Sequence, residues 1–258
     1  MRTSCPKGSN LIPVAFFVWM LLAFAILWIG NFTNLDMVLA DHYYNFTTGK
    51  FPWKRDWFVA VLMHYWLRTI LIVFGLGFIL WEIAEWLRPK SSPVTRYRLA
   101  VVAISAALVP STIAVLKRFS SSHCPWDIDR YGGDYPYIRL LEEWPAGMEA
   151  GQCMPAGHAS SALWLAALAV FWLPRNPAVA FAVYTGGLLL GFGLGWAQQM
   201  RGAHFLTHTL WSVWIASVII GIMIFAFRRK IVEADAEIHS FRGVLASGIS
   251  ARGNNATD

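Results

Sequence analysis

The stretch Phe205–Phe227 reads FLTHTLWSVWIASVIIGIMIFAF and contains no Asp, Glu, Lys or Arg. A helix rises about 1.5 Å per residue, so about 20 apolar residues cross the roughly 30 Å hydrocarbon core of a bilayer. A surface helix of a soluble domain would carry polar residues on its solvent side. The stretch therefore predicts a transmembrane helix.

Five further apolar blocks accompany this one and define the class of protein. Soluble chains carry about 25% charged residues, whereas this chain of 258 residues has 14% charged and 57% hydrophobic residues. We predict an all-α fold, a polytopic membrane bundle of about six transmembrane helices. The predicted spans are Leu11–Asn31, Thr69–Leu87, Leu99–Leu116, His158–Leu173, Ala178–Ala197 and Phe205–Phe227.

The remaining segments are expected to complete a single membrane-embedded domain over residues 1–258. No small-x-small cleavage site closes the first block, which favours an uncleaved span over a signal peptide. Asp56–Leu67 is expected to form an amphipathic helix on the membrane surface. The polar tail, residues 229–258, is expected to be helical only in part.

Basic residues predict the orientation. The connection 88–98 holds four of them, and Arg228-Arg229-Lys230 directly follow the last span. Cytoplasmic loops are enriched in Lys and Arg, so both termini and the tail are expected in the cytoplasm, with the long loop 117–157 outside. The same rule accounts for the net charge of +6, which excludes nucleic-acid binding as its explanation.

This orientation brings three separate segments to the outer face: residues 117–126, 153–158 and 198–208. They contain four of the seven His of the chain. Segments that converge at one end of a bundle can form an active site.

The first of these segments begins with Lys117 and Arg118, at the end of the third span. Two cations on the outer side go against the positive-inside trend. They indicate either a bound anion or side chains that simply reach the interface.

The second segment, MPAGH at 154–158, precedes an apolar helix. The Gly157 N–H would be free to bind an anion, and His158 could protonate a leaving oxygen. The alternative is an ordinary Pro-Gly turn with an interfacial His.

The third segment places His204 and His208 on one helix face, four residues apart. The pair could bind a metal ion, or His204 could be a nucleophile that His208 orients. Two interfacial His without function are the third alternative. Arg201 beside them is either a phosphate clamp or an interfacial Arg.

Together, the three segments resemble the signature of the type-2 phosphatidic acid phosphatase superfamily, which includes bacterial acid phosphatases and vanadium haloperoxidases. The family pattern is K-x6-R-P, then P-S-G-H, then S-R-x5-H-x3-D. Order and spacing agree from about the second span to the sixth. The matches are Lys117, Pro125, Pro155, Gly157, His158 and His204; the departures are Cys124 for Arg, Ala156 for Ser, Gln198 for Arg and His208 for Asp.

The resemblance implies metal-independent phosphoryl transfer without a cofactor. Lys117 and the Gly157 N–H would hold the phosphate oxygens. His204 would attack phosphorus to form a phosphohistidine, and His158 would protonate the leaving group.

The departures imply substitutes for the missing groups. His208 would hold the His204 tautomer in place of the family's Asp, and Asp127 or Asp129 could supply the negative charge. Arg118 and Arg201 are the candidates for the lost arginines.

The cysteines give a separate prediction. Cys124 and Cys153 flank the outer loop, where thiols are oxidised more readily than in the cytoplasm, so we predict a Cys124–Cys153 disulfide. The alternative is two buried free thiols. Cys5, on the cytoplasmic side, is expected to be a free thiol.

These observations favour a phosphatase for a membrane lipid phosphate or diphosphate, such as an isoprenoid diphosphate, a phosphatidate-type lipid or lipid A. A phosphotransferase of the same fold, a metal-binding protein using His204 and His208, and a non-catalytic protein remain alternatives. The expected partners are the substrate lipid and the bilayer. The expected location is a bacterial inner membrane, with the site facing the periplasm or exterior.

Overall fold

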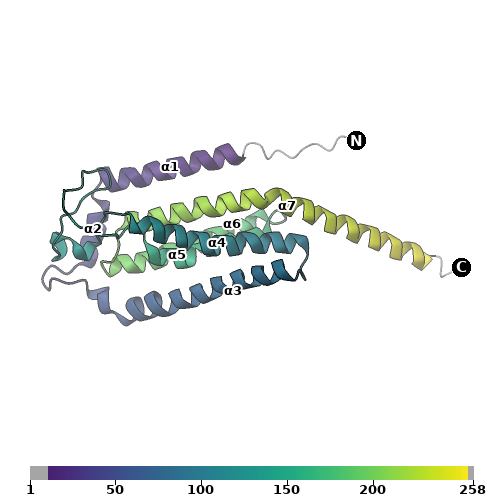
Figure 1. Ribbon diagram of the computed structural model, residues 1–258, viewed down its shortest axis with the longest axis horizontal. Coiled ribbons are helices and arrows are strands. Elements are labelled where there is room, and N and C mark those ends of the chain that lie inside the picture. Colours follow the sequence, from purple (N-terminus) through teal and green to yellow (C-terminus); the bar gives the residue numbers. More distant parts are fainter. Residues whose placement is uncertain (1–10, 255–258) are drawn as a thin grey trace.

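The computed structural model describes residues 11–254, which form helices joined by loops (Figure 1). A π-helix, Trp57–Leu67, leads into α3, and a 3-10 helix, Trp164–Trp172, continues α5. Short 3-10 turns lie at Pro52–Arg55, Pro125–Asp127 and Asp129–Tyr131. The α-helices are α1 (Leu11–Phe32), α2 (Leu35–Tyr43), α3 (Arg68–Leu87), α4 (Pro93–Arg118), α5 (Gly157–Leu163), α6 (Pro177–Met200) and α7 (Leu206–Asn254).

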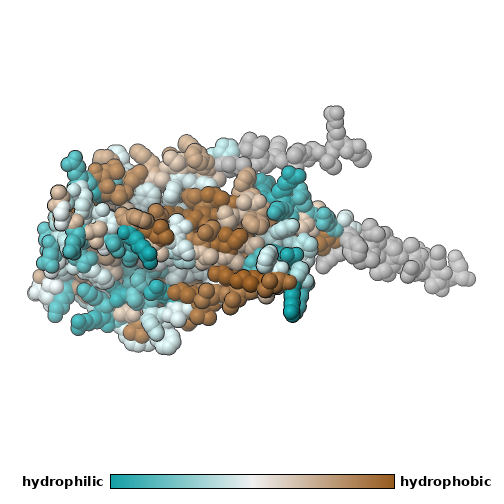
Figure 2. Space-filling model, in the orientation of Figure 1, coloured by the Kyte–Doolittle hydropathy of each residue, from teal (hydrophilic) through white to brown (hydrophobic). Residues whose placement is uncertain are grey.

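Five helices are long and apolar enough to cross a membrane, and a shorter apolar helix, Gly157–Trp172, accompanies them. Figure 2 shows hydrophobic surface along the middle of the bundle and hydrophilic residues toward its ends. The predicted all-α polytopic bundle is confirmed. The five long segments are Pro13–Phe32, Trp57–Leu87, Pro93–Arg118, Pro177–Met200 and Leu206–Ile238.

Two predictions about the connecting segments need correction. Residues 57–67 do not form a separate surface helix, because Trp57–Leu87 is one continuous apolar helix. Helix α2 was not predicted. The tail is more helical than expected, since α7 continues to Asn254. Cys5 and the last four residues lie outside the described residues.

Helix α4 lies at the centre of the bundle and packs against α3, α5 and α7 (Figure 1). Its core face presents small and β-branched residues, including the fully buried Val102, Val109 and Ile113, to Trp164 and Ile220. Lipid tails are as apolar as these side chains, so close van der Waals packing holds the helices together here.

Glycines allow α6 to pack closely against the α5 segment, which here means α5 together with the 3-10 helix that continues it, Gly157–Trp172. A Cβ at Gly187 would collide with the backbone of Ala166, and one at Gly191 would collide with the side chain of Leu163. The two segments can therefore approach this closely only because these positions lack a side chain.

Local capping residues determine where the central helices begin. Ser92 accepts a hydrogen bond from the Thr95 N–H, and Asn176 accepts one from the Val179 N–H. Each cap is followed by a proline, Pro93 or Pro177, at the first helical position, where its missing N–H costs nothing.

The helix directions bring the three candidate segments to one end of the bundle. Helix α4 ends there, α5 begins there, and α6 ends there just before α7 begins (Figure 1). Helix α2 and the loop between α4 and α5 cover the same end. Arg139 in that loop donates hydrogen bonds to the carbonyl oxygens of Asn31 and Thr33 and to Oδ1 of Asn34, so the loop is attached to the α1–α2 turn.

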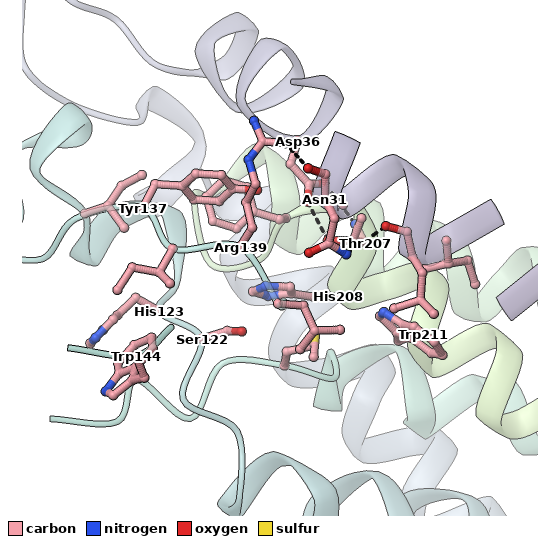
Figure 3. A pocket seen from close by; sticks show the side chains of 18 of the residues that line it. Asn31, Asp36, Ser122, His123, Tyr137, Arg139, Trp144, Thr207, His208 and Trp211 are labelled. Carbon is pink, nitrogen blue, oxygen red and sulfur yellow. Dashed lines mark hydrogen bonds between the residues drawn. The ribbon is translucent and has the colours of Figure 1, made fainter. Parts of the chain in front are cut away.

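A buried carboxylate fixes the first turn of α7. Asp36, on α2, accepts a hydrogen bond from the Thr207 N–H at 3.0 Å and another from the Thr207 hydroxyl (Figure 3). Its side chain is 3% exposed, and burial raises the pKa of the Asp36 carboxyl. The carboxylate thus satisfies N–H groups that the start of α7 leaves free.

We expect Asp36→Ala to lower the unfolding free energy by about 1–2 kcal/mol, because a helix cap is lost and the Thr207 donors stay buried. Asp36→Asn should cost less, since its amide oxygen still accepts one bond. Thermal unfolding in detergent would measure both. Asp129→Ala, which removes an exposed carboxylate at the same end, is the matched control; an equal loss in that variant would contradict this role for Asp36.

Candidate active site

A cavity of about 680 Å³ lies between α3, α4 and the α5 segment. Four of the predicted site residues line it: Lys117, Arg118, Gly157 and His158. Residues far apart in sequence therefore share one space at the end of the bundle.

Of the three predicted histidines, His158 lines this cavity, together with Lys117. The ring centres of His158 and His204 are 6.4 Å apart, and those of His204 and His208 are 5.7 Å apart. The positive charge of Lys117 helps to lower the pKa of His204. The structure thus brings Lys117, His158 and His204 together.

His204 is buried between α6 and α7, with 2% of its surface exposed. Its Nδ1 faces Sγ of Cys153 at 3.4 Å. Burial, together with the nearby His208 and Lys117, holds the pKa of His204 well below 6.5. The ring is therefore neutral at pH 7.

His208 meets the ring of His204 edge to face, and no hydrogen bond joins the two rings in the described part of the chain. Its buried Nδ1 has no hydrogen-bond partner among those residues. The ring borders a second, small cavity of about 30 Å³, which Asp36, Tyr137 and Arg139 also line (Figure 3). A cavity of that size holds one or two waters.

His158 has two buried ring nitrogens without a hydrogen-bond partner in the described residues. Its ring lies against that of His64 from the π-helix, with the two ring planes tilted by 33° and the ring centres 4.2 Å apart. A buried imidazole with both nitrogens unpaired is placed to exchange a proton with a bound ligand.

The two candidate arginines differ in their surroundings. Arg118 is exposed and lines the large cavity. Arg201 instead donates to Oε1 of Gln198 at 2.8 Å and to the carbonyl oxygen of Lys54 at 3.4 Å, and it is not among the residues that line the cavity.

The two candidate acids are engaged elsewhere. Asp127 accepts a hydrogen bond from the Cys124 N–H, and Asp129 accepts one from the Arg130 N–H. The buried acid beside the histidines is Asp36, which was not predicted.

His64 and Arg68 were also not predicted, although Arg68 lines the large cavity. A sequence signal existed for both, because polar residues within an apolar helix usually face the bundle interior or a site. Interpreting 56–67 as a surface helix assigned the polarity of His64 to solvent.

Cys124 and Cys153 form a close pair, with Cα atoms 5.3 Å apart. Backbone hydrogen bonds from Gly151, Gln152 and Cys153 to the segment 120–122 join the same two stretches of the loop. The first motif is thereby held against the second.

Among the described residues, one group has three potential metal ligands within 4.8 Å of one another: Cys124, Cys153 and His204. His208, which the metal-binding alternative requires, is not a member. A metal ion here would need both sulfurs as free thiolates.

A family model described as the PAP2 superfamily matches residues 97–232, just over half of the chain. The chain is also 25% identical over 201 residues to the lipid A 4'-phosphatase of Francisella tularensis subsp. novicida (strain U112), an alignment that covers 75% of this chain and 83% of that protein. No solved structure matches the chain.

The family model extends over all three motif segments. Residues of the first two segments line the large cavity, and His204 of the third segment lies next to His158. The resemblance found in the sequence is confirmed: the chain belongs to the PAP2 superfamily.

Proposed function

We propose that this protein is a metal-independent phosphatase for a membrane lipid phosphate or diphosphate. Membership in the PAP2 superfamily supports phosphatase activity in general. The cavity is the observation that carries the proposal, because it joins a cationic end, which His158 also lines, to an apolar wall. An isoprenoid diphosphate, a phosphatidate-type lipid and lipid A are the candidate substrates, and the lipid A 4'-phosphatase relative supports the last.

The wall of the cavity favours a lipid over a soluble phosphate ester. It is formed by apolar and small side chains of α3 and α4, which follow the helices away from Lys117. A hydrocarbon chain gains contact there, while the phosphate stays with the cations. The wall residues are Leu71, Ile72, Leu76, Ile79, Ala106 and Ala107.

The proposed mechanism uses groups of this chain only. Lys117 and the Gly157 N–H bind the non-bridging phosphate oxygens. Nε2 of His204 attacks phosphorus as the P–O bond to the leaving group breaks, and His158 gives that oxygen a proton. Water then attacks the phosphohistidine, with His158 taking up the proton, and releases phosphate.

The proposed setting is the inner membrane of a bacterium, with both termini in the cytoplasm. The candidate site lies at the end opposite the start of α1 and the end of α7 (Figure 1). It would therefore face the periplasm or exterior.

Purified wild-type protein should release phosphate from one or more members of a lipid-phosphate panel. His158→Ala should lower kcat by roughly 10²- to 10⁴-fold, the usual effect of losing a general acid. His204→Ala should abolish the acid-labile phosphoenzyme that rapid quench would trap. His42→Ala, which removes an exposed His at the same end of the bundle, should remain active.

The same assay separates the alternatives. EDTA should leave activity unchanged and vanadate should inhibit it; loss of activity with EDTA would favour the metal-binding alternative. Transfer of phosphate to an added acceptor lipid would indicate a phosphotransferase. Full activity of His204→Ala would rule out the phosphohistidine.

A pH dependence of stability should follow from the neutral state of His204. Its pKa lies well below the 6.5 of an unfolded His, so between those values the unfolded chain binds a proton that the folded chain excludes. This contribution lowers the unfolding free energy as pH falls below 6.5. Unfolding at pH 7.5 and 5.5 should show a smaller drop in His204→Gln; an equal drop would contradict a neutral His204.

We further propose that the close pair Cys124 and Cys153 is a disulfide in the native protein. Mass mapping without reductant should find the two joined, and neither should react with an alkylating agent in native membranes. Reaction should appear after treatment with dithiothreitol. Alkylation of Cys124 before reduction would show two free thiols instead.

A further inference from the structure

The large cavity contains a cation that belongs to none of the three motifs. Arg68, the first residue of α3, lines it together with Lys117 and Arg118 of α4 and His158 of α5. No Asp or Glu is among the described residues that line this cavity. Its positive charge is therefore uncompensated.

The Arg68 side chain makes no hydrogen bond or ion pair with the other residues that the structure describes. It lines the same cavity as Lys117 and His158. Arg68 is exposed at the start of α3 and shares the cavity with a second cation, so an anion bound there could contact both. The charges of the cavity thus match a phosphate group.

The motif positions where the family has arginine are both occupied by other contacts. Cys124 is paired with Cys153. Gln198 accepts a hydrogen bond from Arg201, whose guanidinium also reaches the backbone of Lys54. Neither position presents a free guanidinium to the cavity.

The position of His64 indicates which side of the helix carries Arg68. It lies four residues earlier on the same continuous helix, about one turn away. The centre of its ring lies 4.2 Å from that of His158, so this face of the helix is turned toward the histidine that lines the cavity. Arg68 follows on that face.

We propose that Arg68 is a phosphate-binding residue, which faces Lys117 across the cavity and replaces the arginine that the motifs lack. The proposal rests on the proposed function for its substrate, a lipid phosphate. The planar guanidinium can bind two phosphate oxygens at once, whereas Lys117 binds as a point charge. The two cations then hold the phosphate from facing helices.

Orthovanadate, which resembles phosphate and forms the five-coordinate geometry of its transfer, tests this without turnover. Isothermal titration calorimetry would measure its affinity for detergent-solubilised wild type, Arg68→Ala, Arg68→Lys and Arg55→Ala. Loss of one charge-assisted contact should weaken binding roughly 10- to 100-fold in Arg68→Ala. Arg68→Lys should fall between, and Arg55→Ala, an exposed cation at the same end, should stay within twofold.

Kinetics and stability add two readouts. The KM for the lipid substrate should rise by a similar factor in Arg68→Ala, and its melting temperature should not fall, because an unpaired cation has been removed. Vanadate affinity within twofold of wild type in folded Arg68→Ala would overturn the assignment. Vanadate binding by a wild-type protein that releases no phosphate would instead overturn the proposed function, and the affinity ratio would still decide the role of Arg68.

Discussion

Polar groups inside a membrane bundle must find their partners within the protein, since the lipid offers none. Most of this chain obeys the constraint: Asp36 accepts from Thr207, and Arg139 donates to three acceptors in the α1–α2 turn. Two of the unpaired groups lie at the candidate site. His158 keeps two unpaired buried nitrogens beside the uncompensated charges of Lys117 and Arg68. These unpaired groups are available to bind an anionic ligand.

The family signature is altered here in a physically consistent way. The first motif exchanges an arginine for Cys124, which pairs with Cys153 and holds two segments of the loop together. The third exchanges an acid for His208, while the buried acid at this end of α7 comes from α2. The motifs have lost charged side chains, and contacts from neighbouring segments of the chain take their place.

The apolar blocks predicted nearly all of the spans, because hydrophobic length is a local property of the sequence. Lys117, His158 and His204 could also be placed at one end, since alternating helix directions follow from the order of spans. Asp36 could not be linked to Thr207, because 171 residues separate them. Arg68 could not be identified for a different reason. A polar residue at the start of a helix gives the same sequence pattern whether it faces water or a cavity.

The match to the family model begins at residue 97, so α1, α2 and α3 all lie before it. Yet α2 contributes the carboxylate that caps α7, and the helix Trp57–Leu87 contributes one wall of the cavity. Residues 97–232 therefore do not contain the whole of the candidate site. A chimera that grafts residues 97–232 onto the N-terminal helices of another superfamily member would inherit every motif residue but lose the cap and the cavity wall.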